Sequence, residues 1–191
     1  MTVFDVKEKR AEWEEFSKKV DIRHLVFLDE SGVNTNMTRL RGRSIGKTRV
    51  IDHTPLNTPK TTTVLSSIRI DGSRTTITYT GGTTGKSFVE YLKNDLLPTL
   101  KPEDIVVMDN LRSHHVKGVE AVFADTKFHV VYLPPYSPDL NPIEEMWSKM
   151  KFILRKLKVR DMKKLPDAIN FALNCVTPTD CLHWFANCNY Y

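Results

Sequence analysis

Three short apolar segments, residues 24–28, 105–108 and 128–133, constrain the fold of this chain more than any other feature of its sequence. Each segment is rich in Val, Ile, Leu or Phe and is followed by polar residues or prolines, a pattern typical of β-strands. Two β-branched segments, residues 61–70 and 74–80, are joined by an Asp-Gly-Ser turn, which predicts a β-hairpin. The sequence therefore predicts five strands.

Amphipathic spacing predicts helices between and after these strands. The expected helices are a charged one at residues 6–19, then 87–100, 113–124, 142–158, 162–175 and 178–187. Residues 33–60 are polar, basic and rich in Thr and Pro, which indicates a long loop or irregular hairpin. The element order combines an antiparallel start with parallel crossovers. It predicts an α/β fold in which helices flank a mixed five-stranded sheet.

Composition favours a soluble globular protein. The chain has 191 residues, 40% hydrophobic and 27% charged, enough for one domain with a substantial core. No apolar run approaches the ~20 residues of a membrane helix, and the N-terminus lacks the apolar centre of a signal peptide. The three cysteines form no Cys-x-x-Cys pair, so we expect no disulfide framework. These observations favour an intracellular protein of the cytoplasm, nucleoid or nucleus, without a membrane partner.

The net charge of +5 is unevenly distributed along the chain. Residues 36–60 contain six basic side chains and one acidic side chain, and residues 149–164 contain eight and one. Basic residues segregated in this way predict the binding of a polyanion. A pair of solvated basic surfaces would have the same composition, so charge alone leaves both interpretations open.

Acidic residues follow two of the predicted strands. Asp29 comes directly after residues 24–28, and Asp109 directly after residues 105–108. If these strands are parallel neighbours, both aspartates lie at the same edge of the sheet, where ligands of α/β proteins bind. Glu144 stands near the start of a predicted helix, at the border of its apolar face, whereas Glu145 is about 100° further round and points outward. We therefore expect Glu144 to face the two aspartates.

Three converging carboxylates suit hard divalent cations, and they would repel one another without such ions. Two Mg²⁺ or Mn²⁺ ions about 3.5–4 Å apart could hold the attacking and leaving oxygens of a phosphodiester. An alternative is purely structural. Aspartate is common in turns, and a glutamate near a helix start interacts favourably with the helix dipole.

Three motifs resemble the DDE transposases of the mariner-like insertion-sequence group. They are Phe-Leu-Asp-Glu-Ser-Gly at residues 27–32, Val-Met-Asp-Asn at 107–110 followed by His114, and Pro-Pro-Tyr-Ser-Pro-Asp-Leu-Asn-Pro-Ile-Glu at 134–144. The third motif is the most specific. The interval of 34 residues between Asp109 and Glu144 matches the short interval of that group.

The resemblance implies an RNase H-like fold in which Asp29, Asp109 and Glu144 are catalytic and bind two Mg²⁺ or Mn²⁺ ions. It implies cleavage of DNA at transposon ends with water as the nucleophile. The freed 3′-hydroxyl is then joined to target DNA, commonly at TA, by an enzyme expected to act as a dimer. The partners would therefore be transposon-end DNA, target DNA and a second copy of the enzyme.

The resemblance also predicts the domain organisation. Residues 21–191 correspond to the DDE catalytic domain, and residues 1–20 to a charged helix or a remnant of a linker. The N-terminal helix-turn-helix domains of complete family members are not expected, and a separately encoded subunit could supply them. Asn189 stands where the family would have glycine.

Six residues outside the acidic triad are candidates for contacting DNA. On the helix that begins near Glu144, three of them recur at i+7, i+11 and i+14 on the side of that glutamate: Lys151, Arg155 and Lys158. The other three are Arg41 and Arg43 of the first basic segment and His114. The alternatives to a transposase are another RNase H-like nuclease and a non-catalytic DNA-binding or regulatory remnant.

Overall fold

One five-stranded sheet forms the centre of the computed structural model, which describes residues 3–56, 60–109, 117–124 and 126–191. The spatial order of the strands is β3-β2-β1-β4-β5. Their bounds are β1 Leu25–Val33, β2 Thr62–Ile68, β3 Thr76–Thr80, β4 Ile105–Met108 and β5 His129–Tyr132. The predicted mixed sheet of five strands is confirmed.

The central strand, β1, pairs antiparallel with β2 and parallel with β4. The sequence pattern ended this strand before Asp29, and that boundary is wrong because β1 continues to Val33. The parallel pairing ends at Leu28↔Met108, but β2 continues to pair with β1 as far as Val33. Asp29 is therefore an internal strand residue, paired with Ser66 of β2.

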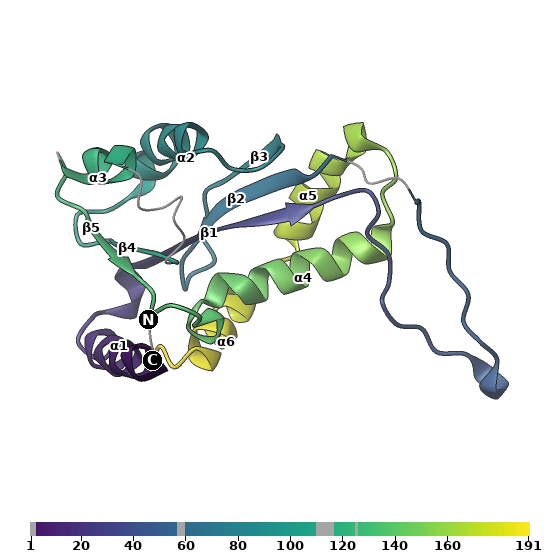
Figure 1. Cartoon of the computed structure of the whole chain (residues 1–191), viewed down its shortest axis with the longest axis horizontal. Helices are drawn as coiled ribbons and strands as arrows, with labels where there is room; N and C mark the ends of the chain where they lie inside the picture. The colour runs from purple at the N-terminus through teal and green to yellow at the C-terminus, as the bar shows by residue number, and fades with distance from the viewer. Residues whose placement is uncertain (1–2, 57–59, 110–116, 125) are drawn as a thin grey trace.

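Helices cover both faces of the sheet, with α2 and α3 on one face and α4 on the other (Figure 1). Their bounds are α1 Val3–Ser17, α2 Gly85–Tyr91, α3 Lys117–Ala124, α4 Pro142–Leu157, α5 Leu165–Asn174 and α6 Pro178–Asn187. Alternate residues of β1 enter the two cores: Phe27 packs with α4, α5 and α6, whereas Val26 and Leu28 pack with α2 and α3. No helix in the described residues is both long and apolar enough to cross a bilayer.

The predicted helix at residues 87–100 is not uniform. Its α-helical part, α2, ends at Tyr91 and continues as a π-helix over Leu92–Leu96 and a 3₁₀ turn over Leu97–Thr99. Pro98 gives the physical reason, because proline lacks the N–H of a helical hydrogen bond and its ring clashes with the preceding turn.

A buried hydrogen-bond relay joins α1 to the C-terminal end of the chain. Trp13 Nε1 donates to Tyr190 Oη at 2.9 Å, and Tyr190 Oη donates to the Leu140 carbonyl oxygen at 2.7 Å. Arg10 adds an ion pair to Asp139 at 2.5 Å. The predicted charged helix is thus packed against the segment that leads into α4.

Replacing Tyr190 with phenylalanine is expected to lower the free energy of unfolding by about 1–3 kcal/mol, because the Trp13 N–H and the Leu140 carbonyl both lose a buried partner. Urea unfolding followed by tryptophan fluorescence measures the change. Tyr191→Phe is the matched control, since the Tyr191 side chain is 86% exposed. Equal stability of the two variants would contradict a stabilising role for the relay.

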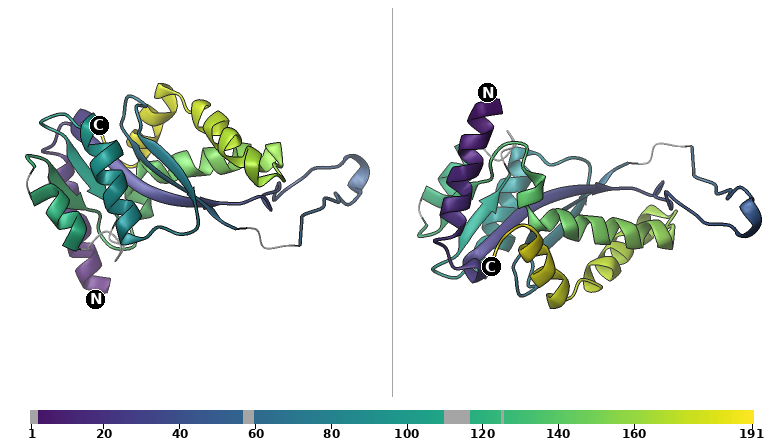
Figure 2. Two further views of the ribbon diagram at one scale, coloured as in Figure 1. Left: turned by 90° about the horizontal axis from the view of Figure 1, so that it is seen from above. Right: turned by 90° about the horizontal axis from the view of Figure 1, so that it is seen from below.

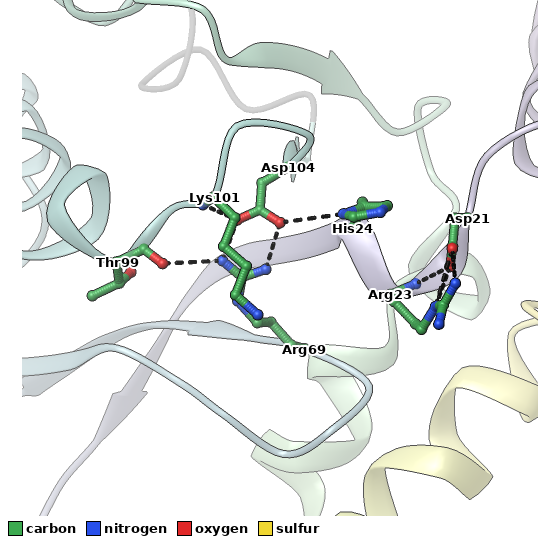
Figure 3. A network of polar contacts seen from close by, with 7 residues as sticks. All are labelled: Asp21, Arg23, His24, Arg69, Thr99, Lys101 and Asp104. Atoms are coloured by element: carbon green, nitrogen blue, oxygen red, sulfur yellow. Dashed lines mark hydrogen bonds and ion pairs between the residues drawn. The ribbon is translucent and has the colours of Figure 1, made fainter.

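A buried ion pair lies beside the start of β4 (Figure 3). Arg69 Nη1 and Nη2 donate to the two carboxylate oxygens of Asp104 at 2.8 and 2.5 Å, and the Asp104 side chain is fully buried. The Lys101 N–H also donates to Asp104, at 2.5 Å, and His24 Nδ1 lies 3.9 Å from it. Burial alone would raise the pKa of Asp104, but the hydrogen bonds from Arg69 and Lys101 outweigh it and lower that pKa.

The segment at residues 34–56, here called the arm, leaves the end of β1 and projects away from the body of the molecule (Figure 2). Hydrogen bonds and an ion pair join the base of the arm to residues that follow α4. Arg160 Nη1 donates to the carbonyl oxygens of Thr35 and Met37 at 2.5 and 2.8 Å. Lys158 Nζ lies 2.6 and 2.7 Å from the two carboxylate oxygens of Asp52. The expected long irregular loop is confirmed for its described part.

Candidate active site

Asp29 and Asp109 lie side by side on the two central strands. β1 and β4 are parallel neighbours with Leu28 opposite Met108, so the next residue on each strand is one of the two aspartates. The predicted juxtaposition at one sheet edge is therefore confirmed. β4 ends at this point, whereas β1 continues beyond it, so Asp29 sits on a rigid strand and Asp109 at a strand end.

The Asp29 carboxylate is almost completely buried, with 5% of the residue exposed. Trp147 Nε1 donates to its Oδ2 atom at 2.9 Å, from the face of α4 that covers the sheet. Burial raises the pKa of Asp29 to about 7, although hydrogen bonds from Trp147 and the Glu30 N–H oppose the rise. The negative charges of Asp109 and Glu144 raise that pKa further.

The helix α4 positions Glu144 in its first turn. Pro142 is its first residue and Asn141 takes the N-cap position, as expected, but the Asn141 side chain makes no capping hydrogen bond. Its Oδ1 atom is buried without a partner among the described residues. The helical spacing predicts an apolar stripe of Ile143, Trp147, Met150, Leu154 and Leu157. The stripe is buried as far as Leu154, but the prediction is wrong for Leu157, which is 45% exposed where the helix ends.

Glu144 and Glu145 line the same pocket at the start of α4, but their charges act on different titratable groups. Partial burial raises the pKa of Glu144; Lys151 lowers it, and the charge of Asp109 raises it. Glu145 instead acts on Cys188 at the end of α6, where burial first and the Glu145 charge second raise the thiol pKa to about 12. Glu144 is therefore the glutamate whose charge reaches the aspartates.

The three acids influence one another's charge without forming a shared ligand shell. No three His, Cys, Asp or Glu side chains in the described ranges are grouped so that they could hold one ion. The donor set nevertheless fits a hard divalent cation, because it consists of carboxylate oxygens whose mutual repulsion a cation would relieve. Burial is the main cause of the raised pKa values of Asp29 and Glu144, and the repulsion between the acids adds a smaller contribution.

The candidate DNA-contacting residues are distributed between α4 and the arm. Lys151 is near enough to Glu144 to lower its pKa, and Arg155 lies one turn further along α4. Lys158 is already paired with Asp52 of the arm. Two more candidates, Arg41 and Arg43, are exposed on the arm. The sixth, His114, lies outside the described residues.

The contact between Trp147 and Asp29 is not predicted by the sequence pattern, because the helical spacing indicates only that Trp147 belongs to the core. Its position three residues after Glu144 on the buried stripe was a usable signal, since a buried indole N–H needs an acceptor. Glu30, also adjacent to the first aspartate, is bound elsewhere: Thr83 Oγ1 donates to its carboxylate.

Solved structures with the same fold include those of the Mos1 mariner transposase. The Mos1 transposase in its paired-end complex with the left transposon end has a TM-score of 0.77 and 15% identity, covering 97% of this chain and 59% of that one. The Mos1 catalytic domain has a TM-score of 0.70 and 14% identity, covering 97% and 89%. The mixed sheet and its flanking helices therefore define an RNase H-like fold.

The family itself follows from the sequence. The family model of the DDE superfamily endonucleases matches residues 24–166, three quarters of the chain. The chain belongs to this family. No curated protein matches the sequence. The chain spans about 59% of the length of the Mos1 transposase in its paired-end complex.

Proposed function

We propose that this chain is the catalytic domain of a mariner-like transposase, which cleaves DNA at transposon ends and joins those ends to target DNA. The observation that carries the proposal is the parallel pairing of β1 with β4, which brings Asp29 beside Asp109, together with Glu144 in the first turn of α4, near enough for its charge to raise the pKa of Asp29. Membership of an endonuclease family and the fold shared with the Mos1 catalytic domain support the same function.

Asp29, Asp109 and Glu144 would hold two Mg²⁺ or Mn²⁺ ions. When bound, such ions activate water as a nucleophile and stabilise the leaving oxygen of a phosphodiester. The protein contributes orientation: Trp147 fixes one oxygen of Asp29, and the β1 backbone fixes the residue itself. Structures of Mos1 complexes with Mn and with Mg support this choice of ions.

The DNA backbone would follow α4 away from the acids. Lys151 places a positive charge next to Glu144, and Arg155 extends the basic face by one turn. Lys158 can contact a phosphate only by exchanging its present partner, Asp52. The proposal includes a dimer bound to transposon ends, a TA target and a separate helix-turn-helix subunit for end recognition. The Mos1 paired-end complex with the left transposon end supports the part of this proposal that concerns transposon ends.

Replacing Glu144 with glutamine is expected to reduce Mn²⁺-dependent nicking of a supercoiled plasmid by at least about a hundredfold, because an amide lacks the charge that holds the ion. Glu145→Gln is the matched control. It should keep activity within about tenfold of the wild type, since Glu144 is the glutamate whose charge raises the pKa of Asp29, whereas the Glu145 charge acts on Cys188.

Circular dichroism should show both variants folded. An inactive Glu145→Gln beside an active Glu144→Gln would contradict the assignment of the third acid. A wild type that binds DNA but nicks no plasmid in Mn²⁺ would favour the non-catalytic remnant. Nicking that survives the loss of Glu144 would instead point to a different nuclease arrangement.

A further inference from the structure

The arm carries a concentration of basic charge without neighbouring acids. Between residues 39 and 49 the sequence holds four arginines, one lysine and no acidic residue. The single acid of the arm, Asp52, is already paired with Lys158 at its base. The outer part of the arm therefore presents uncompensated positive charge to solvent.

Exposed apolar side chains lie among these arginines. Leu40 is 78% exposed and Ile45, at the tip, is 97% exposed. The tip is a defined turn over Ile45–Lys47 in which Gly46 has a φ of 74°, a conformation that favours glycine. Ser44 closes the turn by donating its hydroxyl to the Thr48 carbonyl oxygen. The tip of the arm therefore carries an exposed apolar residue, with basic residues on both sides of it in the sequence.

The arm has an outgoing limb before the turn at Ile45–Lys47 and a returning limb after it. The two limbs approach each other at Gly42. A Cβ atom at this position would lie 2.7 Å from Cγ1 of Val50, so only glycine permits the approach without displacing Val50. The approach brings Arg41 and Arg43 of the outgoing limb to the same level as Arg49 of the returning limb. The result is a narrow projection with arginines on both limbs.

We propose that the arm lies along the minor groove of A·T-rich duplex DNA and inserts Arg41 and Arg43 into it. This inference rests on the proposed function, since it assumes that the substrate is DNA. The minor groove is narrow over A·T tracts, and its strengthened negative potential attracts arginine. Its walls are deoxyribose rings, which suit the exposed Leu40 and Ile45, and apolar side chains at the tips of minor-groove binders contact base steps.

The arm begins some distance along β1 from Asp29, so it would meet DNA away from the reacting bond. Four residues of β1 lie between Asp29 and Asn34, the first residue of the arm, so the base of the arm is about 17 Å from Asp29 at the rise of a β-strand. That distance equals about five base pairs of B-DNA. The arm therefore contacts DNA flanking the reacting bond, and it contributes a preference for flanking sequence.

Three 30-base-pair duplexes of equal charge test the proposal: A·T-rich, G·C-rich, and one in which inosine replaces every guanine. Inosine·cytosine has the major-groove pattern of G·C but lacks the 2-amino group in the minor groove. Fluorescence anisotropy without divalent metal is expected to show at least tenfold tighter binding to the A·T and inosine duplexes than to the G·C duplex.

The double variant Arg41→Lys/Arg43→Lys keeps the charge and loses the planar guanidinium groups. It should reduce the preference to less than threefold while binding the G·C duplex as the wild type does. Arg23→Lys/Arg74→Lys makes the same chemical change away from the arm and should keep the full preference.

Three outcomes would overturn the inference. One is wild-type binding to duplexes without an A·T preference, which leaves the proposed function intact. Another is an inosine duplex bound like G·C, which places the contact in the major groove. The third is wild-type self-association that the arm variant abolishes while the A·T preference persists, which assigns the arm to a second copy. A protein that binds no duplex contradicts the proposed function as well.

Discussion

Replacing Asp104 with alanine is expected to lower the free energy of unfolding by about 3–5 kcal/mol, a large part of the stability of a domain of this size. The variant leaves the Arg69 guanidinium, whose side chain is only 10% exposed, without its carboxylate. The Lys101 N–H loses its acceptor as well. Urea unfolding at neutral pH measures the change.

Two controls separate the buried charge from the loss of a contact. Arg69→Met/Asp104→Leu removes both charges and should cost clearly less than the single variant, because no unpaired charge stays buried. Asp21→Ala breaks the nearby exposed pair with Arg23 (Figure 3) and the N-cap of the following turn, and should cost only about 1 kcal/mol. If Asp104→Ala proves as stable as Arg69→Met/Asp104→Leu, the Arg69 charge reaches solvent and the argument from a buried charge is wrong.

Replacing Asp29 with asparagine is expected to stabilise the metal-free protein progressively as the pH rises from 4 to 8. The folded-state pKa of Asp29 is raised from an ordinary 3.8 to about 7, so its contribution to stability is complete below pH 4 and is lost as pH rises through 7. Each pKa unit corresponds to about 1.4 kcal/mol, which gives the variant an advantage of up to about 4 kcal/mol at pH 8.

The measurement is the difference in free energy of unfolding between the variant and the wild type, at each pH and in the presence of a chelator. Asp180→Asn is the control of opposite sign. Hydrogen bonds from Lys149 and Thr177 outweigh the effect of burial and lower the pKa of Asp180 to about 2. Its difference from the wild type should stay constant from pH 5 to 8 and shrink only in more acidic solution. A constant difference for Asp29→Asn would contradict the burial argument.

Local sequence pattern predicted which elements exist, because strands and helices have distinct periodicities. The hairpin of β2 and β3, the strand β4 and the helix α6 lie at or within two residues of their expected positions. The end of β1 could not be predicted in the same way. Residues 29–33 contain acidic and small polar side chains, and only pairing with β2, a segment distant in sequence, makes them a strand.

The acidic residues could be predicted because strand ends and helix phase limit where a carboxylate can lie. The raised pKa of Asp29 could not, because it depends on burial under α4 and on a contact with Trp147, 118 residues away. The ion pair between Lys158 and Asp52 could not be predicted for a similar reason. Its partner, Asp52, belongs to an irregular segment whose path no periodic pattern describes.

The parallel pairing of β1 with β4 also determines when the carboxylates meet during folding. Asp29 and Asp109 are 80 positions apart, and Glu144 arrives from a third segment further along the chain. Contacts between such distant segments close large loops, so they form slowly and late compared with helices and hairpins. In a chain still emerging from the ribosome, the third acid therefore joins the two aspartates only after α4 has been synthesised and packed. The order of folding itself delays the assembly of the three acids until the domain around them is complete.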